Sequence, residues 1–246
     1  DIQTIVNFAI DRKIDAVWPG WGYLSENPAF ATALRDAGIE FIGPSADCLT
    51  ILGDKLECMK LASSLNIPVL AYQEIESETE LKAVCEKIKY PVMLKAVEGG
   101  GGKGIREVQT PDELLTNYNS VTKEVSGKLF VMKKAVNSFH LEVQFVSDGH
   151  KAKHLYGRDC SIQRRSQKLI EEGPITIAPK KIQEEMYQAA VLLAETMCYK
   201  GVGTAEFLYN PQDNTYTFLE INPRLQVEHI ITELLLTLNL PAIQMA

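Results

Sequence analysis

The feature that most restricts how this chain can fold is a run of glycines between two strand-like segments. Residues 99–104 read Gly-Gly-Gly-Gly-Lys-Gly, so five of these six positions lack a side chain. The preceding segment, 90–97 (YPVMLKAV), and the following one, 104–109 (GIREVQ), are both typical of strands. Glycine is costly inside a strand because it loses the most backbone entropy on folding and packs against nothing. The run therefore needs a purpose other than continuing a sheet.

Two lysines beside the glycine run indicate what it could bind. Lys95 lies in the preceding strand and Lys103 lies within the run. Consecutive N–H groups with no side chains in the way can wrap around an anion. A Walker A loop does not fit because no helix begins here with Gly-Lys-Ser/Thr, and a dinucleotide-binding turn does not fit because a strand follows. A flexible hairpin tip is the ordinary alternative, and we favour a mobile flap that closes over phosphates.

The order of patterns along the chain predicts an α/β (α+β) fold. Helical and strand-like segments alternate at first, with a helix starting at Pro28 and capped by Asn27. Strand-like segments dominate from 140 to 172, and apolar residues over 182–197 recur at the spacing of a buried helix stripe. The segments GTAEFLYN and TYTFLEIN flank Pro-Gln-Asp-Asn and predict a hairpin.

Composition narrows the class of protein. A chain of 246 residues with 46% hydrophobic and 23% charged residues is typical of a globular protein of one or two domains. The net charge of −7 argues against a nucleic-acid partner. No apolar run approaches the roughly 18 residues of a membrane helix. The five cysteines are irregularly spaced, which favours reduced thiols over disulfides or zinc. Because the chain opens without Met, as if within a helix, we expect it to be a fragment.

Two glutamates in the predicted hairpin indicate a metal site. If the strands pair around 211–214, Glu206 and Glu220 lie nearly opposite each other on one face. Like charges directly across a ladder are destabilising, and a divalent cation between them removes the conflict. Asn222 points to the same face, and hard oxygen ligands suit Mg²⁺. Two solvated glutamates in a different register are the alternative.

The segment 222–229 (NPRLQVEH) alternates polar and apolar residues. In an extended conformation Arg224, Gln226 and Glu228 would face the same way. An arginine can hold a small planar oxyanion with two parallel hydrogen bonds, and a nearby carboxylate can act as its general base. An amphipathic edge strand is the alternative.

A basic cluster stands out within residues 157–172 of this acidic chain; it contains Arg158, Arg164, Arg165 and Lys168. An ion-pair cluster with the two glutamates at the end of the segment is the alternative. Together with the glycine run, the paired carboxylates and the oxyanion clamp, the basic cluster predicts a site for phosphoryl transfer from a nucleotide.

These motifs resemble the biotin carboxylase component of biotin-dependent carboxylases, which has the ATP-grasp fold. The resemblance covers nearly the whole chain in order, through WPGWGYLSENP (18–28), ILGDK (51–55), VMLKAVEGGGGKGIR (92–106), HLEVQFVSDG (140–149), GRDCSIQRRSQK (157–168), EEGP (171–174) and FLEINPRLQVEH (218–229). In detail the chain is most similar to the eukaryotic multidomain acetyl-CoA carboxylases, which begin fatty-acid synthesis. Pyruvate and propionyl-CoA carboxylases are the nearest alternatives.

The resemblance implies that bicarbonate attacks the γ-phosphate of ATP to give carboxyphosphate, whose CO₂ passes to biotin. It implies an ATP-binding set consisting of Lys55, Lys95, Gly99, Gly100, Gly101, Gly102, Lys103, Gly104, Met132, Lys133, Ala135, His140 and Gln163. It implies Mg²⁺ (or Mn²⁺) ligands at Glu206, Glu220 and Asn222. Bicarbonate would be held by Lys168, Arg224, Gln226, Val227 and Glu228, with Lys168, Arg224 and Glu228 catalytic and Glu228 the base.

The resemblance also implies a domain division. Residues 1–54 would be a partial N-terminal Rossmann-like (pre-ATP-grasp) subdomain. Residues 55–246 would be the ATP-grasp domain with a mobile glycine-rich lid at about 69–133, and the family's C-terminal subdomain would be absent. Implied partners are a biotin carboxyl carrier domain and a carboxyltransferase domain, probably [sic] omitted from this segment of the same polypeptide, and further copies of the protein. A cytoplasmic location is implied, with a plastid or mitochondrion as alternatives.

Two other interpretations remain open at this stage. Another ATP-grasp ligase, such as a carbamoyl-phosphate synthetase, would not account for both the basic cluster and the segment 222–229. A non-catalytic nucleotide-binding regulatory domain is suggested by the missing subdomain and by Ser166, which stands where the family usually has histidine. The retained charges argue against this interpretation, because an idle site has no reason to bury them.

Overall fold

The computed structural model describes residues 1–97, 104–125, 127–164 and 167–246. Gly99 to Gly102, Lys103, Arg165 and Ser166 lie outside the described residues. The elements in chain order are α1 (Ile2–Asp11), β1 (Ala16–Val17), α2 (Pro28–Asp36), β2 (Glu40–Phe41), α3 (Ala46–Gly53), α4 (Lys55–Ser64), β3 (Tyr72–Ile75), α5 (Glu78–Ile88), β4 (Val92–Ala96), β5 (Ile105–Val108), the 3₁₀ helix η1 (Pro111–Glu113), α6 (Leu114–Glu124), β6 (Leu129–Lys133), β7 (Phe139–Asp148), β8 (Ala152–Arg164), β9 (Gln167–Glu172), α7 (Lys180–Thr196), β10 (Lys200–Asn210), β11 (Thr215–Asn222), α8 (His229–Leu236) and α9 (Leu240–Met245). No helix in these ranges is long and apolar enough to cross a membrane.

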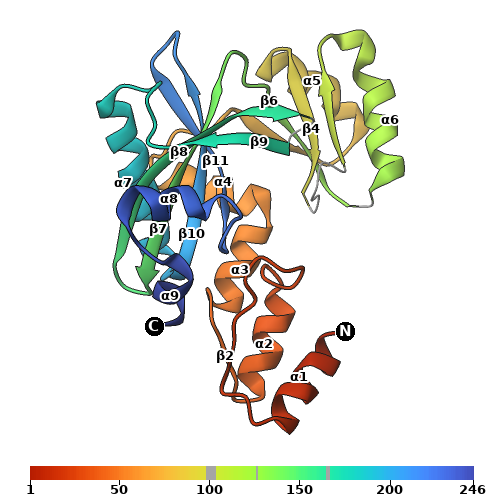
Figure 1. Ribbon diagram of the computed structural model, residues 1–246. Helices are drawn as coiled ribbons and strands as arrows, with labels where there is room; N and C mark the ends of the chain where they lie inside the picture. The colour runs from red at the N-terminus through yellow and green to blue at the C-terminus, as the bar shows by residue number, and fades with distance from the viewer. Residues whose placement is uncertain (98–103, 126, 165–166) are drawn as a thin grey trace.

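The N-terminal part is a small unit built on the parallel strands β1 and β2, at the bottom of Figure 1. Helix α2 begins as predicted, because the side chain of Asn27 accepts a hydrogen bond from the Phe30 N–H at 2.9 Å and Pro28 occupies its first turn. Phe30 packs edge-on against Phe41 of β2 in the core of this unit. Helix α3, which the sequence analysis did not predict, is capped by Ser45.

A four-stranded sheet in the order β3-β6-β4-β5 lies at the upper right of Figure 1, next to α5 and α6. Its strand β4 alternates between buried and partly buried positions. Val92 and Leu94 pack with apolar residues of α5 and α6. Because successive side chains of a strand point to opposite faces, Lys95 lies on the face away from these helices.

The second large sheet has five antiparallel strands in the order β11-β10-β7-β8-β9. Helix α7 covers one face with the predicted apolar stripe, including Met186 and Leu193. Leu141 and Val143 of β7 pack into this core. The alternate residues of β7, such as Glu142, therefore lie on the opposite face of the sheet.

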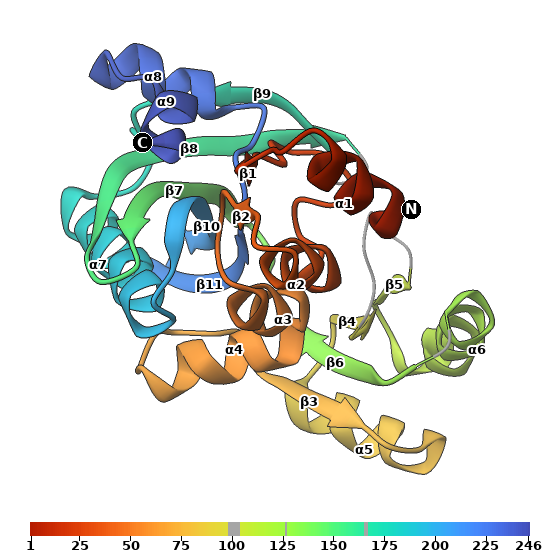
Figure 2. The ribbon, with the colours of Figure 1, turned by 90° about the horizontal axis from the view of Figure 1, so that it is seen from below.

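Helix α4 joins the two large sheets. Its Cys58 and Ala62 pack in the core of the five-stranded sheet. Leu56 and Met59 pack against Met132 and its neighbours in the four-stranded sheet. Seen from below, α4 accordingly lies between β11 and the four-stranded sheet (Figure 2). This arrangement directs the start of α4 toward the space between the sheets.

The prediction that residues 222–229 are extended is wrong. Strand β11 ends at Asn222, a bend and a turn follow, and Glu228 precedes the first residue of α8 as its N-cap. Pro223 lacks an N–H for the ladder, and Leu225 is buried with Val202 and Leu240. Arg224, Gln226 and Glu228 therefore do not share one face of a strand.

Two glycines allow a test of how closely β7 and β8 approach. A Cβ at Gly157 of β8 would lie 2.4 Å from Ile175 Cδ1 and 2.7 Å from the Glu142 carbonyl oxygen, whereas a Cβ at Gly53 of α3 would meet nothing within 4 Å. We expect Gly157→Ala to lower the free energy of unfolding by about 2 kcal/mol through overpacking. Gly53→Ala should raise it by up to about 1 kcal/mol. Urea unfolding measures both, and equal effects would contradict the packing described.

Candidate active site

Lys168 of β9 lies at the centre of a cluster of three carboxylates. Its Nζ donates to Glu142 Oε2 at 2.6 Å, to Glu228 Oε1 at 2.7 Å and to Glu206 Oε1 at 2.9 Å. An ammonium group has three N–H donors, so each carboxylate takes one of them. The cluster ties together β7, β9, β10 and the N-terminus of α8.

The register of the five-stranded sheet explains why these carboxylates meet. Glu206 of β10 pairs directly with Glu220 of β11 on one side and with Glu142 of β7 on the other. Glu142 in turn pairs with Arg158 of β8. The predicted opposition of Glu206 and Glu220 is confirmed, and it extends into a row of four charged residues across four strands. We call Arg158, Glu142, Glu206 and Glu220 the charged row.

Lys168 determines the protonation of the carboxylates around it. Burial alone raises the pKa of Glu206, but hydrogen bonds and charges from His140 and Lys168 outweigh it and lower this pKa to about 2. Burial also raises the pKa of Glu228, and the bond to Lys168 again lowers it below its ordinary value. Burial lowers the pKa of Lys168 itself, while Glu142 and Glu206 raise it above its ordinary value. These three groups are therefore charged at neutral pH.

The other end of the charged row is less well neutralised. Burial raises the pKa of Glu220, the charge of Glu206 raises it further, and Lys55 and Lys95 only partly oppose this. Burial lowers the pKa of Lys95, and the nearby charge of Lys55 adds to this effect. Lys55 at the start of α4 and Lys95 of β4 are thus brought to Glu220 from two other parts of the fold.

The residues at this end fit a divalent cation. Glu206 and Glu220 form a like-charged pair in which the pKa of Glu220 is raised, and a cation would relieve this repulsion. The Asn222 side chain reaches the same place, because its Nδ2 donates to Glu206 Oε1 at 2.9 Å. His140, Glu142 and Glu206 also bring one ligand atom each within 4.8 Å of one another. Carboxylate and amide oxygens form the donor set that suits Mg²⁺.

His140 links the predicted nucleotide residues to the carboxylate cluster. Its Nε2 lies 2.8 Å from Glu206 Oε2, and its Nδ1 lies 2.8 Å from Gln163 Nε2. Since an amide nitrogen can only donate, Nδ1 accepts and the proton lies on Nε2. Burial lowers the pKa of His140, but Glu206 outweighs it, so this pKa is raised overall.

The predicted oxyanion clamp is divided between two places. Arg224 is not bonded to Lys168 or Glu228; its Nε donates to Glu26 Oε1 at 2.5 Å. The pair lines a hollow of about 550 Å³. Gln226 is 4% exposed, and its Oε1 is buried with no hydrogen-bond partner among the described residues. Val227 is 67% exposed.

The other predicted nucleotide residues lie on or near the four-stranded sheet. Met132 is buried between this sheet and α4. Lys133 donates to the backbone carbonyls of Lys89 and Tyr90, and Ala135 follows β6. Gly104 has φ +68°, and a Cβ there would lie 2.9 Å from the Ala96 Cβ, so both its conformation and its packing require glycine.

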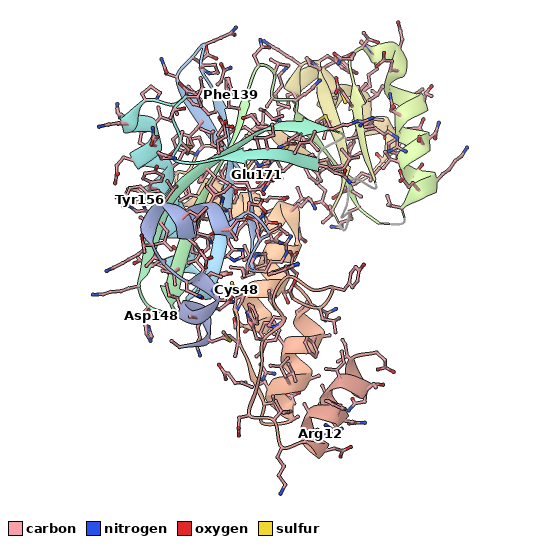
Figure 3. All side chains as sticks on the ribbon, in the orientation of Figure 1. Arg12, Cys48, Phe139, Asp148, Tyr156 and Glu171 are labelled. Carbon is pink, nitrogen blue, oxygen red and sulfur yellow. The ribbon has the colours of Figure 1, made fainter. Side chains whose placement is uncertain are left out.

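Sequence reasoning missed Glu142 as a partner of Lys168. The available signal was the alternation of His140, Glu142 and Gln144 in a strand whose other residues are apolar. It also left open an ion-pair cluster at the end of β9. The structure pairs Arg158 with Glu142 at 2.6 Å, and within the described ranges Glu171 on β9 (Figure 3) forms no ion pair.

Two family models match the chain. Residues 54–246 match the model described as carbamoyl-phosphate synthase L chain, ATP binding domain, and residues 1–49 match the biotin carboxylase N-terminal domain. Acetyl-CoA carboxylase 2 of Arabidopsis thaliana is 43% identical over 271 residues, covering 100% of this chain and 12% of the relative. Acetyl-CoA carboxylase of Schizosaccharomyces pombe is 42% identical over 275 residues, with the same coverage. The chain thus spans about an eighth of these relatives.

Solved biotin carboxylases have the same fold. A Campylobacter jejuni biotin carboxylase in a β-γ-ATP complex is 34% identical with a TM-score of 0.95, covering 99% of this chain and 56% of that one. The biotin carboxylase domain of Hydrogenobacter thermophilus 2-oxoglutarate carboxylase, in complex with MgADP, ADP and bicarbonate, is 34% identical with a TM-score of 0.94. It covers 99% of this chain and 55% of that one.

Removing the central cation tests its part in stability. We expect Lys168→Met to lower the free energy of unfolding by about 3–5 kcal/mol at pH 7, because buried carboxylates lose their counter-ion. In the wild type, the depressed pKa values of Glu206 and Glu228 contribute stability above pH 4.5 that is lost as the pH falls. In the variant these pKa values rise, so the loss should shrink as the pH falls toward 4.5. Urea unfolding at pH 7 and pH 5 measures this, with the exposed Lys153→Met as control. An equal loss at both pH values would contradict the account.

Proposed function

The chain belongs to the family of carbamoyl-phosphate synthase L chain ATP-binding domains, in its biotin carboxylase branch, and from this premise we propose that it carboxylates biotin with ATP and bicarbonate. The observation that carries the proposal is the bond between Lys168 and Glu228 beside the Glu206–Glu220 pair. It puts a cation and a carboxylate for an oxyanion next to oxygen ligands for a phosphate-bound metal.

The proposed reaction has two steps. A bicarbonate oxygen attacks the γ-phosphorus of ATP, the bond to the β-phosphate oxygen breaks, and ADP and carboxyphosphate form. Carboxyphosphate then breaks its C–O bond to release CO₂ and phosphate, and the CO₂ is captured by a ureido nitrogen of biotin. The phosphate is the proposed base that takes the proton from that nitrogen.

The charged residues between the two sheets would hold the nucleotide. Lys55 and Lys95 are the cations for the phosphates, and Gly104 ends the loop that would cover them. A Mg²⁺ or Mn²⁺ ion held by Glu206, Glu220 and Asn222 would neutralise charge that develops on the phosphates. His140 and Gln163 would contact the nucleotide, while residues near Met132 would lie against its base.

Lys168 and Glu228 would act on bicarbonate as a pair. Bicarbonate that accepts a hydrogen bond from Lys168 competes with Glu228 for the same ammonium group. The pKa of Glu228, which Lys168 lowers, then rises toward its ordinary value, and the carboxylate becomes a better proton acceptor. Arg224 would leave Glu26 to bind the planar anion with its guanidinium fork, assisted by Gln226 and the Val227 backbone.

The wider context of the reaction is also a proposal. We assign residues 1–54 to a partial N-terminal subdomain and 55–246 to the ATP-grasp domain, with a lid at about 69–133. Biotin would arrive on a carboxyl carrier domain, and a carboxyltransferase domain would pass the carboxyl group to the acceptor. The 42–44% identity to acetyl-CoA carboxylases supports acetyl-CoA as that acceptor.

Replacing the proposed base provides the test. We expect Glu228→Gln to reduce bicarbonate-dependent ATP cleavage by at least about 100-fold, because the amide accepts no proton from bicarbonate. ATP affinity, measured by calorimetry, should change less than about threefold, since Glu228 contacts no part of the proposed nucleotide site. The assays use this chain and a version extended at its C-terminus with the remainder of a biotin carboxylase.

Glu86→Gln on the exposed face of α5 is the matched control, and it should leave both quantities unchanged. A Glu228→Gln enzyme with a near-normal rate would contradict the assignment of the base.

A further inference from the structure

A second polar layer lies beneath the Lys168 cluster. Arg158, Glu142 and Gln144 are each 0% exposed, and Thr232 of α8 is 1% exposed. Of these, Arg158, Gln144 and Thr232 have no part in the proposed reaction. A buried guanidinium costs several kcal/mol of hydration unless its surroundings replace the lost hydrogen bonds. Its contacts therefore need an explanation.

Arg158 connects two strands to α8. Its Nε donates to Glu142 Oε1 at 2.6 Å. Its Nη1 donates both to Gln144 Oε1 at 2.9 Å and to Thr232 Oγ1 at 2.6 Å. Gln144 is fixed in turn, because its Nε2 donates to the Gly203 carbonyl at 2.8 Å. The guanidinium is thus held by the sheet, and Thr232 is held by the guanidinium.

The same helix returns to the Lys168 cluster one turn earlier. Glu228 and Thr232 are four positions apart, so they lie on the same side of α8. Glu228 reaches Lys168, and Thr232 reaches Arg158. Glu142 completes the connection, since one of its oxygens accepts from Arg158 and the other from Lys168. The result is a closed ring that runs through Lys168, Glu142, Arg158, Thr232 and Glu228.

Helix α8 has little else to hold its first turn. It spans only His229–Leu236, and its N-cap makes no side-chain hydrogen bond to the helix. His229 and Thr232 are its only residues that the structure buries within this described helix. Ile230 and Leu234 are exposed. The bond between Thr232 and Arg158 is therefore a large part of what orients this turn.

We propose that Arg158 is a positioning residue that acts through Thr232 to hold the first turn of α8, and so to aim the Glu228 carboxylate at Lys168. This role rests on the function proposed for Glu228. Displacing a catalytic group by about 1 Å can cost up to about 100-fold in rate, so a fixed first turn would raise turnover without contributing to nucleotide binding.

Thr232→Val tests the proposal with little change of shape. It removes the hydroxyl, keeps a β-branched side chain, and leaves Arg158 paired with Glu142 and Gln144. We expect the turnover number for bicarbonate-dependent ATP cleavage to fall about tenfold, with the affinity for ATP within twofold of wild type. Thr232→Ser should restore most of the rate, because serine retains the hydroxyl. Thr196→Val, at the exposed end of α7, is the matched control and should change neither quantity.

Hydrogen exchange provides a readout that does not depend on activity. In Thr232→Val the amides of the first turn of α8 should exchange at least about fivefold faster, with unchanged exchange in α7. Wild-type turnover and wild-type exchange in this variant would overturn the positioning role, and so would a Thr232→Ser variant as slow as Thr232→Val. If Glu228→Gln retains activity, the assignment of the base fails instead, and hydrogen exchange alone then decides whether Arg158 positions α8.

Discussion

The site depends on one electrostatic constraint, the charged row across the five-stranded sheet. Three neighbouring strands place Glu142, Glu206 and Glu220 directly opposite one another, and like charges in such positions repel. Arg158 neutralises one end of the row from β8, and Lys168 bonds to Glu142 and Glu206 from β9. The sheet can hold this arrangement only because cations from other segments meet it.

The neutralising groups also connect the parts of the fold. Lys55 comes from the start of α4, and Lys95 comes from the face of the four-stranded sheet that α5 and α6 leave uncovered. Both act on Glu220, whose pKa remains raised. The end of the row that protein cations neutralise least is thus the end where a metal and the phosphates of a nucleotide would bind. In this account the repulsion that makes the site costly also makes it selective for cations and anions together.

The sequence predicted most reliably what local chemistry decides. The hairpin register that opposes Glu206 and Glu220 follows from a short turn, and the start of α2 follows from Asn27 and Pro28. The segment 222–229 failed because Pro223 ends the ladder and the burial of Leu225, a tertiary contact, decides the rest. Glu142 and Thr232 were missed because their partners are distant in sequence: Lys168 lies 26 residues from Glu142, and Arg158 lies 74 residues from Thr232.

The central claim is that bicarbonate, held by Lys168 and Glu228, attacks the γ-phosphate of ATP. The most direct test incubates the chain, extended at its C-terminus, with ATP, Mg²⁺ and ¹⁸O-labelled bicarbonate, and measures the phosphate released by mass spectrometry. The account predicts that each phosphate carries one oxygen from bicarbonate, because the bridging oxygen of carboxyphosphate stays with phosphorus. Phosphate that carries oxygen only from water would contradict it.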